Sequence, residues 1–295
     1  MTISAGSTKS RNGRVSRRGF LLGGLGVGIA GVDACGAPAT NASGNSPDRV
    51  LSGEVLTSPP AAPAETVSAE QVHSPARGGS VELITIRPAG VGGLLPVCVA
   101  LHGRSSGARM FLDLGVPELL DQVVAAGVRP FAVAAVDGGD TYWVAKDPKD
   151  DPQRMLLEDL PQWLANRGFA SAPSAALGIS MGGYGALNYA RNPGLTAVAA
   201  VSAALFTNWP DARLRNAFAG EAQWQATDPL RHVQEIAQVP LGVWCGTGDP
   251  FIAANRQLID KAKPKVAALA AGDHDAAYWR RILPDVLRFI GASMP

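Results

Sequence analysis

The sequence has few of the residues that bind metals, phosphates or nucleic acids. It contains four histidines in 295 residues, and none are spaced as His-x-x-x-His. It has no Gly-Lys-Ser or Gly-Lys-Thr phosphate-binding loop. The formal net charge is only +1, which gives no electrostatic basis for nucleic acid binding. We therefore expect no metal, no cofactor and no nucleic acid partner.

The N-terminal region lacks an apolar run long enough to cross a bilayer. Its apolar segment, residues 20–32, has 13 residues with five glycines, too short for a hydrocarbon core of ~30 Å. It follows a basic stretch in which Ser16-Arg-Arg-Gly-Phe-Leu21 fits a twin-arginine export signal. The pattern predicts a signal peptide over residues 1–35. Five of the 26 basic residues but only one of the 25 acidic residues lie in it, so the remainder carries a formal charge of −3.

Cys35 follows the apolar segment at the place where a lipid-modified cysteine would lie. Asp33 is unusual at that distance before such a cysteine, so lipidation, cleavage near Ala39 and no processing all stay open. Residues 36–65 are rich in Ala, Pro, Ser and Asn and are typical of a flexible tether. We expect an exported protein in the cell envelope or outside the cell, anchored to the membrane if Cys35 is lipidated.

Residues 66–295 are long enough for one α/β domain. Residues 71–86 predict a β-hairpin, because Pro75 and Gly78-Gly79 separate two runs of β-forming residues. Short apolar strands then alternate with helical stretches. The predicted strands are residues 96–101, 130–136, 174–179, 197–202, 240–245 and 265–270. This alternation predicts a mostly parallel sheet with helices on both faces.

The most informative motif is Gly178-Ile-Ser-Met-Gly182, between a predicted strand and a predicted helix. Gly-x-Ser-x-Gly at such a junction is the nucleophile elbow of an α/β-hydrolase. The turn raises the Ser180 hydroxyl above the sheet and directs the Met181 N–H to the same space. The motif predicts that Ser180 is a nucleophile.

A nucleophilic serine needs a base, and the base needs an orienting acid. Downstream of Ser180, His232 lies in a stretch with helical spacing, so we interpret it as structural. His274 lies after the last predicted strand and before an amphipathic helix expected over residues 275–290, which favours it as the base. Asp249 follows the strand 240–245 and is the predicted acid, with Asp273 and Asp275 as competitors.

Acyl transfer also requires hydrogen-bond donors for the oxyanion. The strand 96–101 runs into His102-Gly-Arg-Ser-Ser-Gly107, and in this fold the loop after that strand supplies one donor. We expect the N–H groups of Arg104 and Met181 to be the donors, with Gly103 as the alternative to Arg104. His102 is then a loop-shaping residue.

The ordered motifs LHGR, VDGGDTYW, GISMGGYGAL, CGTGDPF and GDHDAAYWR resemble the esterase-D-like branch of the α/β-hydrolases over residues 66–295. That branch includes S-formylglutathione hydrolases, feruloyl esterases and the secreted mycolyltransferases of actinobacteria. The resemblance implies an α/β-hydrolase fold with Ser180, Asp249 and His274 as the triad, and the oxyanion donors named above. Gly183-Tyr-Gly185 departs from the mycolyltransferases, and the chain lacks the length for a large lipid-binding insert.

The resemblance also bears on the two remaining cysteines. It places two strands between the strands of Cys98 and Cys245, so their Cα atoms would lie roughly 14 Å apart. This distance exceeds disulfide reach. We expect two buried thiols and no structural disulfide.

Aromatic residues in two segments are candidates for the substrate pocket. Tyr142 and Trp143 follow the strand 130–136, and His102 lies in the neighbouring loop. Phe206 and Trp209, with Phe218 and Trp224, fall in an insertion expected to form a small helical lid. Exposed aromatics there would suggest an apolar acyl or aromatic group in the substrate. The alternative is that they pack the lid onto the domain.

The sequence therefore predicts an exported serine carboxylesterase that acts on a small-molecule or envelope ester. One alternative is an acyltransferase of the mycolyltransferase type that uses the same acyl-enzyme. The other is a non-catalytic envelope protein on a hydrolase scaffold. The natural ester and the oligomeric state are left open.

Overall fold

The computed structural model describes residues 65–295. The predicted signal peptide over residues 1–35, Cys35 and all but the last residue of the predicted tether 36–65 lie outside the described residues.

The central element is an eight-stranded sheet with the order β1-β2-β4-β3-β5-β6-β7-β8. The strands are β1 (Val67–Ser74), β2 (Gly79–Ile86), β3 (Val97–Leu101), β4 (Ala132–Val136), β5 (Ala175–Ile179), β6 (Ala197–Val201), β7 (Leu241–Gly246) and β8 (Val266–Ala270). β1 and β2 form an antiparallel hairpin, and β2 pairs antiparallel with β4. All the other pairings are parallel. The predicted hairpin and the six predicted strands are confirmed, with the six strand ends within two residues.

The inner strands are continuous runs of small and β-branched apolar residues, as expected for strands that are covered on both faces. Every residue of β3, β4, β5 and β6 is buried. β8, at the edge, is only partly covered. Because β3 to β8 all run parallel, their carboxyl ends meet at one rim of the sheet.

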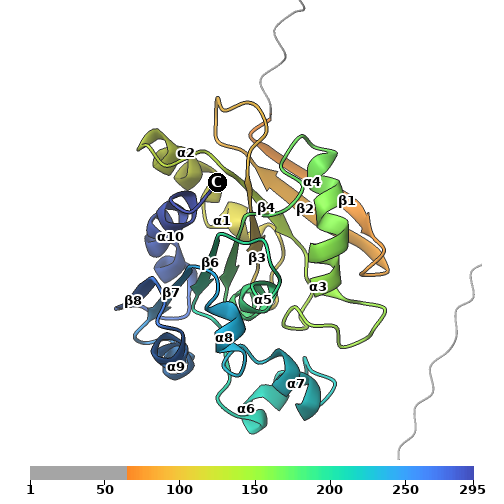
Figure 1. Ribbon diagram of the computed structural model, residues 1–295, viewed down its shortest axis with the longest axis vertical. Coiled ribbons are helices and arrows are strands. Elements are labelled where there is room, and N and C mark those ends of the chain that lie inside the picture. Colours follow the sequence, from red (N-terminus) through yellow and green to blue (C-terminus); the bar gives the residue numbers. More distant parts are fainter. Residues whose placement is uncertain (1–64) are drawn as a thin grey trace, which may run out of the picture. The chain divides into compact units, whose positions relative to one another are not determined.

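Helices cover the two faces of the sheet (Figure 1). One face packs against α1 (Met110–Asp113), α2 (Val116–Ala125) and α10 (Ala276–Gly291). The other packs against η1 (Met155–Asp159), α4 (Leu160–Ala165), α5 (Met181–Tyr189) and α9 (Ile252–Ala262), with α3 (Pro152–Arg154) leading into η1. In Figure 1, α2 and α10 lie together on the left and α3 and α4 on the right. The predicted fold class is confirmed.

The predicted helix after His274 is α10, and its start is fixed by its sequence. Asp275 is the N-cap, and its carboxylate accepts a hydrogen bond from the Tyr278 N–H at 2.8 Å. Its apolar side packs on α2 and on the sheet. This packing sets how the residues at its N-terminus lie beside the rim.

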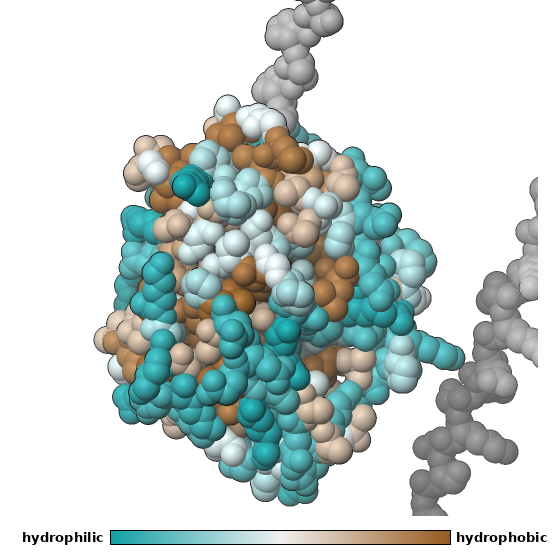
Figure 2. All heavy atoms as spheres, viewed as in Figure 1, coloured by the Kyte–Doolittle hydropathy of each residue, from teal (hydrophilic) through white to brown (hydrophobic). Residues whose placement is uncertain are grey.

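The insertion between β6 and β7 contains α6 (Trp209–Arg213), α7 (Glu221–Thr227) and α8 (Val233–Ile236). Phe206, Phe218 and Trp224 are buried in the core, and Trp209 is half-buried against Trp224, with ring centroids 6.0 Å apart. The surface over α6 to α9 is mostly hydrophilic (Figure 2). The aromatics therefore attach the insertion to the domain, which was the alternative to a pocket.

Cys98 and Cys245 are free and buried in β3 and β7, with β5 and β6 between them. The prediction of two separate buried thiols is confirmed. Within residues 65–295, no helix combines the length and the hydropathy needed to cross a membrane.

Candidate active site

Ser180 lies at the turn from β5 to α5, and its backbone is strained. Its φ of 58° and ψ of −119° are rarely adopted by a non-glycine residue. The turn is possible because of two glycines. A Cβ on Gly178 would overlap the Gly182 backbone, and a Cβ on Gly182 would overlap the Leu101 carbonyl. The predicted elbow geometry is therefore present, and Ser180 itself is 8% exposed.

Two residues from other strand ends join Ser180. His274, after β8, places its Nε2 2.8 Å from the Ser180 Oγ. Its Nδ1 lies 2.8 Å from the Asp249 Oδ2, and Asp249 follows β7. Since a carboxylate can only accept, Nδ1 carries the proton and Nε2 can accept one from the serine hydroxyl.

Asp249 is the buried member of this chain of hydrogen bonds. Its side chain is fully buried, whereas that of His274 is 22% exposed. Burial opposes ionisation of Asp249, but hydrogen bonds from His274 and the Phe251 N–H outweigh it and lower its pKa. Asp275 caps α10 instead. Within residues 65–295, Asp249 is the one aspartate hydrogen-bonded to His274.

Two aromatic rings flank the His274 imidazole, and sequence reasoning missed both. The Phe251 ring centroid is 5.3 Å from that of His274, and the Trp279 centroid is 5.2 Å away in an edge-on contact. The rings restrict rotation of the imidazole. Phe251 lies two residues after Asp249, and Trp279 lies five residues after His274. This closeness in sequence to the predicted site residues could have identified both rings.

The loop after β3 holds three of its N–H groups in hydrogen bonds. The Gly103 N–H contacts the Met110 Sδ at 3.4 Å, the Ser105 N–H donates to Asp140 at 2.7 Å, and the Ala108 N–H donates to Asp137 at 2.6 Å. Within the described chain, the N–H groups of Arg104 and Met181 have no hydrogen-bond partner. Since Gly103 is engaged, the geometry favours Arg104 as the donor in this loop.

His102 shapes this loop, as expected. Its Nδ1 donates to the Gly103 carbonyl at 2.8 Å, and its Nε2 accepts from the Gly138 N–H at 2.9 Å. Since Nε2 accepts a hydrogen bond, it carries no proton and the ring is neutral, and burial lowers the pKa of His102 in the same sense. The Trp143 indole N–H donates to the His102 carbonyl at 3.2 Å. Residues 137–143 therefore support the loop from behind.

A cavity of about 320 Å³ opens beside Ser180 and His274. Its other lining residues are Gly103, Arg104, Ser106, Met110, Asp113, Leu114, Ala276, Trp279 and Arg280. Its walls thus come from the loop after β3, α1 and α10. It is apolar at Met110, Leu114 and Trp279 and charged at Asp113 and the two arginines.

The predicted pocket residues do not line this cavity. Tyr142, Trp143 and His102 are at most 2% exposed, because residues 137–143 turn inward and pack behind the loop after β3. Phe206 and Trp209 pack within the insertion and line no part of the cavity at Ser180. The true lining could not be read from strand ends, because it depends on how α1 and α10 pack.

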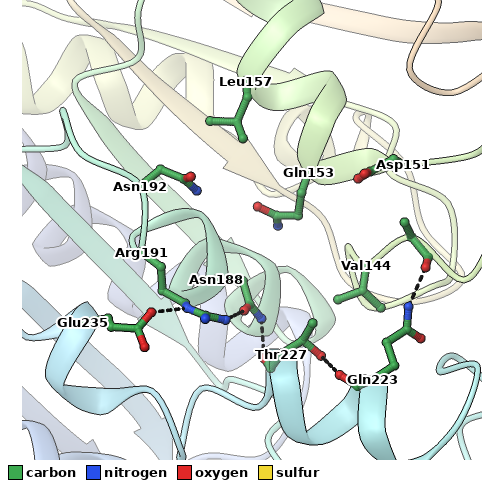
Figure 3. Close-up of a pocket in the computed structure, with 11 residues that line it drawn as sticks. Val144, Asp151, Gln153, Leu157, Asn188, Arg191, Asn192, Gln223, Thr227 and Glu235 are labelled. Carbon is green, nitrogen blue, oxygen red and sulfur yellow. Dashed lines mark hydrogen bonds and ion pairs between the residues drawn. The ribbon is translucent and has the colours of Figure 1, made fainter. Parts of the chain in front are cut away.

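A second cavity, of about 470 Å³, lies between η1, the end of α5 and α7 (Figure 3). Much of its polar lining is bonded within the protein. Arg191 contacts Glu235 at 2.7 Å and Asn188 at 3.2 Å, and the Gln223 amide donates to the Ala145 carbonyl at 2.5 Å. It contains none of the predicted site residues.

The family model described as "Putative esterase" matches residues 78–290. The chain belongs to this esterase family. Membership makes the protein a carboxylic ester hydrolase and confirms the resemblance drawn from the motifs. No curated protein matches the sequence significantly.

Solved structures share the fold of this esterase at low identity. A ferulic acid esterase is 20% identical with a TM-score of 0.66, over 77% of this chain and 97% of its own. The S-formylglutathione hydrolase FrmB of Staphylococcus aureus is 18% identical with a TM-score of 0.61, over 77% and 100%. MPT51 (FbpC1) of Mycobacterium tuberculosis is 21% identical with a TM-score of 0.64, over 79% and 100%.

Proposed function

We propose that the protein is an exported serine carboxylesterase that works through an acyl-enzyme on Ser180. The observation that carries the proposal is the His274 imidazole, which lies 2.8 Å from both the Ser180 hydroxyl and the Asp249 carboxylate. A hydroxyl, an imidazole and a buried carboxylate in this order form the arrangement that activates a serine.

The first half-reaction forms the acyl-enzyme. The Ser180 Oγ attacks the ester carbonyl as its proton moves to His274 Nε2, while Asp249 stabilises the imidazolium. The unpartnered N–H groups of Arg104 and Met181 donate to the oxyanion. The carbon–oxygen bond to the alcohol then breaks, and His274 gives its proton to the leaving alkoxide.

The second half-reaction releases the acid. A water molecule gives a proton to His274 and attacks the acyl carbonyl, and Ser180 leaves as the proton returns to its Oγ. The cavity of about 320 Å³ supports a small ester as the substrate. An acyltransferase would resolve the same intermediate with a sugar hydroxyl, and a non-catalytic envelope protein would have no need of the Ser180–His274–Asp249 arrangement.

The test is labelling and turnover in parallel. The wild-type enzyme should hydrolyse 4-nitrophenyl acetate and be labelled by a fluorophosphonate at the peptide that contains Ser180. Ser180→Ala should remove both signals while the protein stays folded, because the covalent route disappears. Ser68→Ala, which changes a half-buried serine in the edge strand β1, is the control. Near-normal turnover by purified, folded Ser180→Ala protein would overturn the mechanism. Efficient acyl transfer to added trehalose or glycerol would indicate the acyltransferase.

Export is proposed from the sequence of residues 1–35 alone. The twin-arginine route carries folded proteins, and a domain whose cysteines are both free needs no oxidation after crossing. Arg17→Lys with Arg18→Lys should retain the enzyme inside the cell, because the receptor reads the arginine pair. If Cys35 is lipidated, Cys35→Ala should move the protein from the membrane fraction to the medium. A wild-type N-terminus beyond Cys35 in the culture fluid would contradict lipidation.

A further inference from the structure

Arg215 is a cation without an anion. No carboxylate lies within 4.0 Å of its guanidinium in the described chain, and its Nε is buried without a hydrogen-bond partner. A buried charged donor left unpaired is costly. An external acceptor would satisfy it.

Aromatic rings hold this guanidinium in place. Its Cζ lies 5.6 Å from the Phe206 ring centroid and 5.5 Å from that of Phe251. These cation–π contacts keep a planar group in one orientation while leaving its N–H edge free for a ligand.

The guanidinium borders a cavity of about 300 Å³ between the start of the insertion and the start of α9. The walls combine apolar residues, among them Leu205, Phe206 and Phe251, with a similar share of polar surface. One carboxylate, that of Asp211, also lines the cavity, but it is occupied at 2.8 Å by the Asn208 amide and makes no ion pair with Arg215.

One residue that lines this cavity, Phe251, also contacts the reaction site. Phe251 contacts both Arg215 and the His274 ring, so one aromatic ring separates the guanidinium from the imidazole. Arg104 carries a second positive charge at the same rim.

We propose that Arg215 binds a carboxylate on the substrate, so that the natural substrate is an anionic ester. The inference rests on the proposed esterase function. A carboxylate is favoured because the planar guanidinium offers paired N–H donors that match its two oxygens. Both the acyl part and the alcohol part of an ester can bear the carboxylate, and the apolar residues of the walls accept the carbon chain that bears it.

The experiment compares esters that differ only in charge. For the acyl part, the pair is 4-nitrophenyl hydrogen glutarate and 4-nitrophenyl pentanoate. For the alcohol part, it is 3-carboxyphenyl acetate and its neutral methyl ester. Arg215→Gln should lower kcat/KM for the anionic member of at least one pair about 10- to 100-fold, the value of a hydrogen bond to a charged group. The neutral members should change less than about twofold.

Two further variants separate charge from packing. Arg215→Lys keeps the positive charge but loses the paired N–H donors of the guanidinium, so it should retain part of the preference for the anionic ester. Arg213→Gln, which removes an exposed arginine from the neighbouring α6, should leave both rates unchanged. An equal loss on anionic and neutral esters in Arg215→Gln, or no loss on either, would overturn the proposal.

A binding measurement tests the anion site at Arg215 separately from the proposed esterase activity. Calorimetry of Ser180→Ala with glutarate requires no hydrolysis. Arg215→Gln in that background should weaken glutarate binding by a similar factor. Glutarate binding that is absent, or unaffected by Arg215→Gln, would count against the anion site even if neutral esters are hydrolysed normally.

Discussion

The two regions that meet at the rim of the sheet are held by different forces. We call the first the hydrogen-bonded rim: Ser180, Asp249, His274 and the loop 102–108. Its groups are fixed by hydrogen bonds, such as those from Ser105 N–H to Asp140 and from His274 to Asp249. The second is the aromatic insertion, residues 203–240. It is fixed by buried rings such as Phe218, whose centroid is 5.7 Å from those of Tyr142 and Tyr184.

The two kinds of contact have different consequences for catalysis and for stability. Hydrogen bonds have directions, so they place a proton acceptor or an N–H donor accurately, which acyl transfer requires. Ring packing depends mainly on buried area, so it fixes a segment without defining the chemistry. Changes in the rim should therefore affect kcat, and changes to the buried rings of the insertion should affect the free energy of unfolding.

The largest expected effect is that of Asp249→Asn. The amide would donate to Nδ1 and force the imidazole into the tautomer that has its proton on Nε2, which cannot accept one from Ser180. We expect kcat to fall about 10³- to 10⁴-fold, with little change in stability. The measurement is steady-state kinetics on 4-nitrophenyl acetate together with thermal unfolding.

Asp273→Asn and Asp275→Asn are the matched controls, because they make the same change close to His274. Asn also serves as an N-cap, so Asp275→Asn should leave α10 intact. If either variant loses more activity than Asp249→Asn, the acid has been assigned to the wrong residue.

The sequence predicted that Ser180, Asp249 and His274 would meet, and the structure brings them together. Each lies within four residues of the end of a short strand, and the carboxyl ends of parallel strands share one edge. Gly178 and Gly182 allowed the elbow to be predicted from the sequence, because a side chain at either position would overlap neighbouring backbone atoms. Local sequence was therefore sufficient for the position of these groups, while their roles stay a proposal.

The walls of the cavity could not be predicted in this way. Met110 and Trp279 reach the cavity only because α1 and α10 pack against the same face of the sheet. Conversely, Tyr142 and Trp143 follow a strand end but turn inward at φ of 56° and 59°. Aromatic residues at a rim can line a pocket or support a loop, and tertiary packing decides which.

The second effect tests the aromatic insertion. Phe218→Ala should lower the free energy of unfolding by about 3–5 kcal/mol, because it removes a buried ring and leaves a cavity. Folded Phe218→Ala should retain kcat on a neutral ester within about threefold. The measurement is urea unfolding, with Leu214→Ala, an exposed side chain of the same insertion, as the control expected to lie within about 0.5 kcal/mol of wild type. A large loss of kcat in folded Phe218→Ala would remove the distinction between the two regions.

The third effect concerns His102 and pH. Because burial lowers the pKa of His102 in the folded state, the unfolded chain takes up this proton first as the pH falls. Its contribution to stability is complete above about pH 6.5 and is lost as the pH drops toward the folded pKa, at up to about 1.4 kcal/mol per pH unit. Urea unfolding at pH 7.5, 6.5 and 5.5 should show this slope, and His102→Gln should reduce it. His73→Gln, an exposed ring in β1, should keep the wild-type slope. Equal slopes in all three proteins would show that the buried imidazole does not govern acid sensitivity.

The smallest expected effect is that of acyl chain length on kcat/KM. This effect tests whether the acyl chain lies beside the hydrogen-bonded rim or beside the aromatic insertion. Each methylene that enters an apolar cavity contributes up to about 0.8 kcal/mol, or roughly fourfold in kcat/KM, whereas one that stays in water contributes nothing. In a cavity of about 320 Å³, 4-nitrophenyl esters of short acids should be cleaved faster than those of long acids. A kcat/KM that rises steadily beyond about eight acyl carbons would instead require an extended lipid site.

The same substitution in each cavity decides where the chain lies. Ala276→Leu narrows the cavity beside Ser180, and Ala253→Leu narrows the one beside Arg215. If the neutral acyl chain occupies the first cavity, Ala276→Leu should shift the preference to shorter esters by several-fold, and Ala253→Leu should leave it unchanged. The reverse result would place the acyl chain against the aromatic insertion. That insertion would then select the substrate as well as stabilise the fold, because its packed rings would form the wall that the chain contacts.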